Sequence, residues 1–446
     1  MGEQGYVRAP TASPGVQGKR QEGEPLFEKL RPGPGRSSEQ VAANQRARLH
    51  GAMIELVAER GFSGVTIRGL SGLAGVSTRS FYECFTNVED CFVATYIMIL
   101  RNALARPRDS HLPHTDRLRA RLLNFFGYLE SNPKAAHLAL VDALSTGTDL
   151  VANIRTANRL LERSIAEDLA AVQAQNPIPA ALIHGAAAAA LQLARSRLLS
   201  ESVTGPTSVI ADEFADWLVS LRGDCSLVWS DVDLQAGSAF DTPPGAPRPG
   251  CGDDRRFLLA AVTKLGMRDG YSKLTIPAIR REAGVSRPSF DARFAGVADC
   301  FLAAVESRIT AATDRAAARA RGAETWEAGV VRATAGLCIE IKRDAALARL
   351  GYTEILAPGG PGLELQDRTF ARLSRRLRGT APPDTRPNQL AATASVVAAI
   401  AAVGAGRREG IGRLAPTAAF ILLAPAVGAD AAGRAIRSEM APASVA

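Results

Sequence analysis

The sequence predicts an all-α chain made of two similar halves, and three observations lead to this fold class. Alanine is the dominant residue, aromatic residues make up only 5% of the 446 residues, and runs of β-branched residues are scarce, which favours packed helices over sheets. Apolar residues recur at helical spacing after Val41, as at Leu49, Met53 and Leu56, until Gly61 ends the pattern. A segment of the first half also returns in the second half.

The repeat is long enough to indicate duplication of a whole unit. GVSTRSFYECFTNVEDCF at 75–92 returns without a gap as GVSRPSFDARFAGVADCF at 284–301, a constant offset of 209 residues. Matching residues extend over about thirty positions, which chance does not produce. The period is far too long for a solenoid. We therefore expect both halves to share one fold.

The helical pattern continues in the same way behind each copy. Amphipathic helical segments are expected over 116–144 and 328–356, with breaks near 132–133 and 342–344. An Ala-rich helix and a further short helix then close each half, over 180–200 with 206–221 and over 389–407 with 414–427. The Ala-rich stretches are expected to be buried helices and not membrane spans. If the two closing pairs pack on each other, a single chain would form a pseudo-dimer.

The first copy is predicted to hold two short helices joined by a tight turn. Thr66 is a suitable N-cap for a helix over 67–74, and Ser77 is a suitable N-cap for the next helix. Gly75 lies between them, where the left-handed backbone of a tight turn is cheap only for glycine. Two such helices with a third helix behind them describe a helix-turn-helix.

The second short helix presents a polar outer face. Thr78, Arg79 and Tyr82 offer a hydroxyl, a guanidinium and a phenol that can reach a base edge or a phosphate. Asn87, with Asp90 three residues later, suits a capping box at the start of the third helix. The pattern predicts a surface that binds nucleic acid.

The stretch AERGFSGVTIRGLSGLAGVSTRSFYECFTNVEDCF, from Ala58 to Phe92, resembles the DNA-binding domain of the tetracycline-repressor (TetR) family. The resemblance is strong over 41–100, moderate over 255–309 and weak elsewhere. It implies a three-helix DNA-reading domain followed by a helical domain that binds a small effector, with the last two helices dimerising as a four-helix bundle. By position, the resemblance implies DNA contacts at Thr66, Thr78, Arg79 and Tyr82, and a phosphate contact at the helix start marked by Asn87. Val88 stands where family members often carry lysine.

The fold class implied is two tandem TetR-like units, each a three-helix helix-turn-helix domain followed by a helical effector and dimerisation domain. The predicted segments are a flexible arm over 1–39, a first DNA-binding domain over 40–101, a first effector and dimerisation domain over 102–223, a linker over 224–253, a second helix-turn-helix domain over 254–309, a second effector and dimerisation domain over 310–436, and a tail over 437–446.

The second copy keeps the scaffold but changes the reading face. Arg287, Pro288 and Asp291 replace the outward threonine, arginine and tyrosine, and the aspartate is expected to repel phosphate. A second, nonspecific DNA face is nevertheless conceivable, because phosphate neutralisation needs only charge. Its candidate residues are Arg280, Arg281, Arg287 and Arg293. The alternative is a retained scaffold with a solvated basic face.

Other signals are weaker. Phe125, Phe126, His137 and His184 are candidates for an effector pocket, although helical core is the default for the phenylalanines and core or surface for the histidines. We expect no metal, since the other histidine pair, at 111 and 114, has no third ligand within reach by sequence. No catalytic motif or cofactor loop is present, so no enzyme activity and no cofactor are expected. The six cysteines form no CxxC pair, and those at 91 and 300 are expected to be small buried apolar residues.

The predicted function is a ligand-responsive transcriptional regulator, most simply a repressor, in the cytoplasm and associated with the nucleoid. The segment Ser77 to Tyr82 would enter the major groove of a double-stranded DNA operator, while Arg46, Arg68 and the arm approach phosphate. An unknown small-molecule effector would change the arrangement of paired reading heads, in an intramolecular pseudo-dimer or a homodimer. No membrane partner is expected. The alternative is a helical ligand-binding or protein-interaction module that no longer reads DNA.

Overall fold

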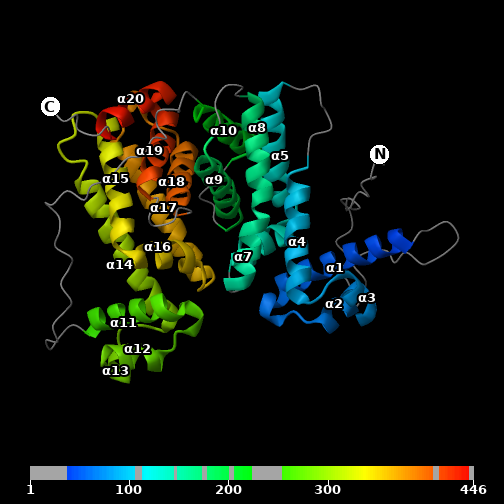
Figure 1. Cartoon of the computed structure of the whole chain (residues 1–446). Coiled ribbons are helices and arrows are strands. Elements are labelled where there is room, and N and C mark those ends of the chain that lie inside the picture. Colours follow the sequence, from blue (N-terminus) through cyan, green and yellow to red (C-terminus); the bar gives the residue numbers. More distant parts are fainter. Residues whose placement is uncertain are drawn as a thin grey trace. The chain divides into compact units, whose positions relative to one another are not determined.

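The computed structural model of the chain describes residues 38–105, 113–144, 148–172, 178–199, 205–222, 254–404 and 411–440. Every regular element in these ranges is helical, which confirms the predicted all-α fold (Figure 1). The predicted arm up to residue 37 and the predicted linker over 224–253 lie outside the described residues. Among the described helices, none combines the length and apolar character needed to cross a membrane.

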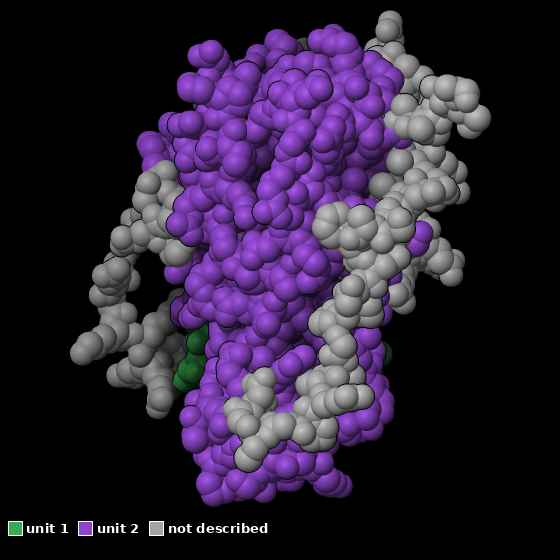
Figure 2. Space-filling model, turned by 90° about the vertical axis from the view of Figure 1, so that its left-hand side faces the viewer, with its two compact units in different colours: residues 1–99, 137–157 green, residues 100–136, 158–446 purple. Residues whose placement is uncertain are grey.

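The chain divides into two compact units, which Figure 2 distinguishes by colour. The first consists of Met1–Ile99 and His137–Ala157, and the second of Leu100–Ala136 and Asn158–Ala446. The second unit therefore holds the whole second half of the chain together with both closing helices of the first half, over 180–199 and 207–220. Two helices, α4 (Val88–Ala103) and α6 (Pro133–Leu140), contribute residues to both units.

The first unit contains the first copy of the repeat. Its elements are α1 (Ser38–Arg60), η1 (Phe62–Gly64), α2 (Ile67–Ala74), α3 (Thr78–Cys84), most of α4, the end of α6, η2 (Asp142–Leu144) and α7 (Thr148–Ala157). Helices α1, α2 and α3 with the start of α4 are called the first head below. Five large apolar side chains are fully buried in it, namely Leu49, Met53, Leu70, Phe81 and Phe92. Burial of these side chains is the main favourable contribution to folding of this small head.

The second unit starts with the remaining helices of the first half. These are α5 (His114–Ser131), α8 (Arg159–Val172), α9 (Ala180–Leu199) and α10 (Thr207–Ser220). The second half follows with the head helices α11 (Asp254–Asp269), η4 (Tyr271–Lys273), α12 (Ile276–Ala283), α13 (Arg287–Asp291) and α14 (Val297–Ala318). The rest comprises α15 (Trp326–Arg343), α16 (Ala345–Ala348), η5 (Arg349–Thr353), η6 (Glu354–Leu356), α17 (Gly360–Thr380), η7 (Pro383–Thr385), α18 (Gln389–Gly404), α19 (Ile411–Val427) and α20 (Ala429–Met440).

The closing helices of the two halves pack on each other within the chain. Helix α9 lies along α18, and α10 and α19 complete the contact (Figure 1). The approach is so close that a Cβ atom on Gly185 would stand 2.5 Å from the carbonyl oxygen of Ala398. The indole Nε1 of Trp217 donates a hydrogen bond to Ser395 Oγ at 2.9 Å across the same surface. Small side chains therefore set the distance between the halves.

The predicted helices over 67–74, 180–200 and 206–221 correspond to α2, α9 and α10, whereas other predicted boundaries differ from the observed helices. Helix α1 begins at Ser38, three residues before the predicted start and inside the predicted arm. Helix α20 continues to Met440, into the segment predicted as a tail, because Ala432, Ile436 and Met440 form a buried stripe at helical spacing. Helix α19 runs through Pro416 and Pro425 without ending.

Candidate nucleic-acid interface and cavities

Helix α3 exposes Thr78, Arg79 and Tyr82, the three polar side chains predicted to form its outer face. Thr78 is exposed, and the Arg79 side chain is 90% exposed with its Nε 3.2 Å from Glu83 Oε1. Tyr82 is 58% exposed, and its ring meets the buried Phe81 ring edge to face at 5.7 Å between centroids. A hydroxyl, a guanidinium and a phenol therefore stand on one short helix and are free to contact a partner.

The local structure that supports α3 is the one predicted. Thr66 Oγ1 accepts a hydrogen bond from Gly69 N at 3.1 Å, and Ser77 Oγ accepts one from Ser80 N at 3.0 Å. Gly75 adopts φ 61° and ψ 38° in the turn, the left-handed conformation that glycine takes without steric cost. The two N-caps and the turn fix where α3 begins.

The predicted capping box at α4 is only half formed. Asn87 Oδ1 accepts a hydrogen bond from Asp90 N at 2.7 Å, as expected for an N-cap. The Asp90 carboxylate accepts from Thr86 N at 2.9 Å and not from Asn87 N. The reciprocal bond therefore moves one residue earlier, and it ties the α3–α4 turn to the first turn of α4.

The side chain of Arg48 supports the turn from the interior of the head, a role that the sequence analysis did not predict. The side chain is 2% exposed. Its Nε donates to the Ala74 carbonyl at 2.7 Å, and its Nη2 bonds the carbonyls of Ala74 and Gly75. These oxygens belong to the end of α2 and to the turn, where backbone acceptors have no helical partner. A charged donor therefore satisfies them and clamps α1 to the turn.

Replacing Arg48 by methionine is expected to destabilise the first head by about 2 kcal/mol, because buried carbonyl acceptors lose a charged donor. The measurement is native-state hydrogen exchange of α2 and α3 peptides, whose opening free energy should fall. Arg60→Met is the matched control, since Arg60 is 55% exposed and its ion-pair partner among the described residues is its neighbour Glu59. Equal exchange in the two variants would contradict the clamp.

The first head also buries a polar group behind α3. His50 is 8% exposed, its Nδ1 lies 2.8 Å from Thr95 Oγ1, and that hydroxyl donates to the Cys91 carbonyl at 2.7 Å. Burial, with a smaller contribution from the charge of Arg46, lowers the pKa of His50 to about 4. Burial raises the pKa of the Cys91 thiol to about 12. The prediction that Cys91 is a small buried residue is confirmed by its burial.

The other predicted contact residues of the first head are on the surface. Arg46 and Arg68 are exposed. The guanidinium of Arg46 lies 5.7 Å from the centre of the Phe85 ring, which orients it without removing it from solvent. Asn87 is exposed as well, beside its capping bond. These positions leave all three side chains accessible.

The second head repeats the scaffold with different chemistry. Thr275 and Ser286 cap α12 and α13 as their counterparts do, and Gly284 has φ 67°. On the outward face, Arg287 Nε is 2.6 Å from Asp291 Oδ2, so the carboxylate neutralises the nearest arginine. Inside, Phe257, Leu259 and Ala304 occupy the positions of Arg48, His50 and Thr95, and this head therefore lacks the buried polar set.

The four arginines proposed as a second DNA face differ in availability. Arg287 is paired as described, and Arg293 Nη1 donates to the Ser289 carbonyl at 3.0 Å. Arg280 is half-buried, and its Nε has no hydrogen-bond partner in the described part of the chain. Arg281 is exposed. A second, nonspecific face would thus depend chiefly on Arg280 and Arg281, which form no ion pair with other described residues, and of these two only Arg281 is exposed.

The residues predicted for an effector pocket lie in helix packing or form hydrogen bonds to carboxylates. Phe125 and Phe126 are buried, and Phe126 packs edge to face on Phe214 of α10. His137 Nδ1 is 2.7 Å from Asp142 Oδ2, and His184 Nδ1 is 2.7 Å from Glu162 Oε1. None of the four lines either of the cavities described below, and their default assignment to core or surface fits the contacts.

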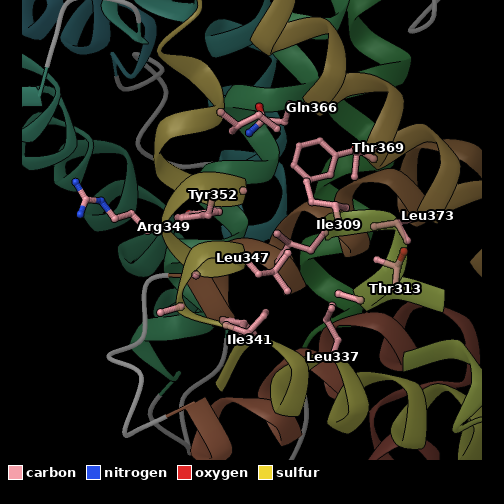
Figure 3. A pocket seen from close by; sticks show the side chains of 18 of the residues that line it. Ile309, Thr313, Leu337, Ile341, Leu347, Arg349, Tyr352, Gln366, Thr369 and Leu373 are labelled. Atoms are coloured by element: carbon pink, nitrogen blue, oxygen red, sulfur yellow. The ribbon is translucent and has the colours of Figure 1, made fainter. Parts of the chain in front are cut away.

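Two adjoining cavities lie in the second half of the chain. The α17 cavity, of about 440 Å³, is bordered by α14, α15, η5, α17 and α18 (Figure 3). The α15 cavity, of about 600 Å³, lies between α14, α15, α17, α18 and α19. Thr313, Leu337 and Leu373 line both. These volumes suit a small molecule. The sequence does not predict these cavities, because they form between helices that are distant in sequence.

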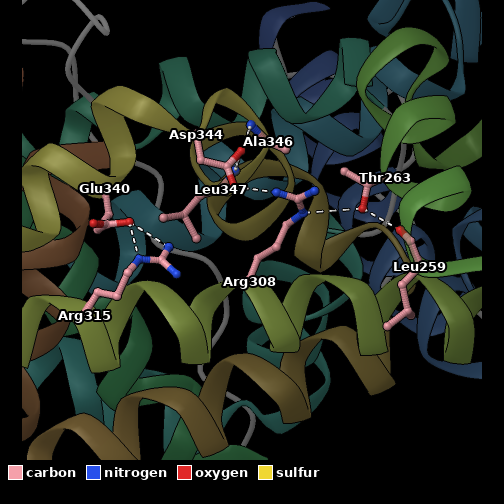
Figure 4. A network of polar contacts seen from close by, with 8 residues as sticks. All are labelled: Leu259, Thr263, Arg308, Arg315, Glu340, Asp344, Ala346 and Leu347. Atoms are coloured by element: carbon pink, nitrogen blue, oxygen red, sulfur yellow. Dashed lines mark hydrogen bonds and ion pairs between the residues drawn. The ribbon is translucent and has the colours of Figure 1, made fainter. Parts of the chain in front are cut away.

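The α17 cavity borders the second head directly. Met267 of α11 lines it, and Arg349 Nη1 donates to the Met267 carbonyl at 2.7 Å. Arg308 of α14 joins α11 to the cavity wall: its Nε donates to Thr263 Oγ1 at 3.4 Å and its Nη1 bonds Asp344 (Figure 4). Asp344 in turn caps α16, which carries lining residues. A contiguous polar network therefore connects the cavity with the head.

No protein-family model matches the chain. Within the described ranges, no group of three or more His, Cys, Asp or Glu side chains is arranged to hold a metal ion.

Proposed function

We propose that the chain is a DNA-binding transcriptional regulator whose first helix-turn-helix reads the major groove. One observation carries the proposal: α3 presents Thr78, Arg79 and Tyr82 outward from a turn that is hydrogen-bonded by two N-caps and a buried arginine. Arginine recognises guanine edges or phosphates, and a tyrosine hydroxyl donates to phosphate. A short helix with such a face suits insertion into the groove.

The two heads are proposed to act unequally. In the first, Arg79 is 90% exposed and retains a guanidinium that can leave its weak surface pair with Glu83. In the second, Pro288 stands at the equivalent position and Asp291 places a carboxylate on the outward face. A carboxylate near phosphate costs binding energy. The second head therefore serves as a weak or nonspecific contact, and the operator is expected to be asymmetric.

The packing of the halves supports a single-chain pseudo-dimer. Helices α9 and α10 from the first half contact α18 and α19 from the second, with Gly185 against Ala398 at the closest approach. A dimeric regulator needs two sets of closing helices, and this chain supplies both. The cavities of the second half are the proposed site of a small-molecule effector that biases the heads between two arrangements.

The test is DNA affinity measured by fluorescence anisotropy on DNA from the chain's own upstream region. Arg79→Ala is expected to weaken binding about tenfold to hundredfold, as for loss of a base contact. Tyr82→Phe is expected to weaken it about threefold to tenfold, as for loss of one hydrogen bond. Arg287→Ala in the second head is the matched control and should change affinity little. If the Arg79→Ala/Tyr82→Phe double variant binds as the parent does, α3 is not the reading helix.

A second candidate function is favoured by the cavities. A helical ligand-binding module without specific DNA reading would explain the cavities and the neutralised face of α13 equally well. It would leave the exposed face of α3 without a purpose. The two functions differ in the anisotropy experiment, because the module would show no dependence on Arg79 or on DNA sequence.

A further inference from the structure

The strongest unexplained feature is a buried polar cluster between the two halves. Arg195 of α9 is 6% exposed, although it lies in a helix of the first half that packs against the second. Its Nη2 bonds Gln192 Oε1 and donates to Gln366 Oε1 of α17 at 2.5 Å. Gln192 Nε2 bonds the Asp367 carboxylate. The cluster thus joins α9 to α17 through side chains of both halves.

Arg195 is incompletely satisfied where it lies. Its Nε has no hydrogen-bond partner among the described residues, and burial lowers the pKa of Arg195 to about 10. A buried guanidinium is tolerated only while its remaining partners stay in place. The bond to Gln366 is therefore a contact whose strength matters for how α9 sits on the second half.

Gln366 has a double role, because it also lines the α17 cavity (Figure 3). A guanidinium has only donors, so Gln366 must turn its Oε1 toward Arg195. Its Nε2 then remains as a donor, and it has no partner among the residues that the structure describes. One amide group thus touches the first half with its oxygen and can serve the cavity with its nitrogen.

The rest of the cavity wall narrows the class of ligand. No Asp or Glu lines it. The cavity has one charged lining residue, Arg349. Its Nη2 lies 3.7 Å from Glu354 Oε1, and its Nη1 donates a hydrogen bond to the Met267 carbonyl. In Figure 3 its guanidinium points away from the other labelled residues. Ile309, Leu347 and Leu373 are typical of the remaining wall. An uncharged molecule fits this lining, because a buried ionised group would have no counter-charge.

We propose that the α17 cavity binds a mostly apolar, uncharged molecule through one carbonyl-type acceptor that takes a hydrogen bond from Gln366 Nε2, and that Gln366 transmits this occupancy to Arg195 in the first half. A hydrogen bond donated by an amide polarises it and strengthens the bond that its oxygen accepts. Ligand binding therefore tightens the contact between α17 and α9. This ligand assignment deepens the proposed effector site. Only the biological purpose of ligand binding, and not the binding itself, rests on the proposed regulatory function.

A continuous set of contacts leads from α9 to the C-terminal end of α4. Helix α9 packs on α18, which contacts α10, and α10 packs along α5. Asn124 of α5 donates from Nδ2 to the carbonyls of Asn102 and Ala103, at 3.2 and 2.7 Å, and so holds the C-terminal end of α4. Helix α4 begins at Val88, immediately after the α3–α4 turn. These contacts end at Asn102 and Ala103, within the second unit.

The experiment uses the full chain and the probe 6-propionyl-2-(dimethylamino)naphthalene, an uncharged aromatic ketone whose fluorescence reports binding. Saturable binding is expected, and hydrogen exchange of α9 peptides should slow about tenfold with the probe bound. The propyl analogue, which lacks the carbonyl, should fill the cavity without slowing α9. Neither readout involves DNA, so failure here and failure of DNA binding are separate results.

Variants of α17 complete the test. Gln366→Leu is expected to bind the ketone about threefold to tenfold more weakly and to show no slowing of α9. Arg368→Leu is the matched control, because Arg368 is 63% exposed on the same helix and should behave as the parent does. Absence of saturable ketone binding would overturn the site. Equal slowing of α9 by the ketone and its propyl analogue, or in Gln366→Leu, would overturn the role of Gln366.

Discussion

Replacing Gly185 by alanine is expected to destabilise the contact between the two halves by about 1 to 3 kcal/mol, the usual cost of overpacking. A Cβ atom there would lie 2.5 Å from Ala398 O and 3.1 Å from Ala398 Cα. The obstacle is backbone, which cannot rotate away as a side chain can. Helices α9 and α18 must separate, and the hydrogen bond from Trp217 to Ser395 is expected to lengthen.

The matched control is Gly127→Ala in α5. A Cβ atom on Gly127 meets nothing within 4 Å, so this variant should gain about 0.5 to 1 kcal/mol from helix propensity alone. The two alanine variants share the same chemistry and should differ by roughly 3 kcal/mol in urea unfolding. Equal stabilities would show that α9 and α18 do not touch at Gly185.

The same preparation tests whether the contact is intramolecular. Light scattering of the parent should give the mass of a single 47.0 kDa chain, and its unfolding midpoint should not change with protein concentration. Destabilisation by Gly185→Ala should likewise be independent of concentration. A stable dimer of the parent would instead place the closing helices between chains and contradict the closed pseudo-dimer.

Local features of the first head could be predicted from the sequence because each depends on a few neighbouring residues. Thr66 and Ser77 are N-caps because their hydroxyls reach backbone N–H groups three residues on, and Gly75 takes the left-handed turn that the spacing requires. The duplication then carried the same interpretation to Thr275, Gly284 and Ser286. Exposure of Tyr82 next to the buried Phe81 follows from helical periodicity, because consecutive residues project about 100° apart around the helix.

Features that depend on contacts between distant segments could not be predicted. Arg48 lies on α1, and nothing in its neighbourhood marks it as the donor for carbonyls 26 residues later. Gln366 and Arg195 are 171 residues apart, and their bond exists only because α9 packs on the second half. The cavities arise from gaps between packed helices. The sequence therefore marks aromatic residues such as Phe125 as pocket candidates, whereas nothing near Gln366 in the sequence marks it as a lining residue.

Burial of His50 is expected to make the stability of the first head depend strongly on pH. The pKa of His50 is lowered from 6.5 to about 4, so the unfolded chain takes up a proton at a pH where the folded head does not. Stability of the first head is therefore complete above about pH 6.5 and falls as the pH drops toward 4. The loss over this window is about 3 kcal/mol.

His50→Leu should remove this part of the pH dependence, because leucine occupies the equivalent position of the second head at Leu259. The Thr95 hydroxyl keeps its bond to the Cys91 carbonyl in the variant, so no buried donor is left unpaired. The measurement is hydrogen exchange of α1 and α4 peptides between pH 4.5 and 7.5, after correction for the intrinsic exchange rate. Thr95→Val is the control: it removes the hydrogen bond but not the burial, and most of the pH dependence should remain. A His50→Leu variant that loses as much stability in acid as the parent would show that another group carries the effect.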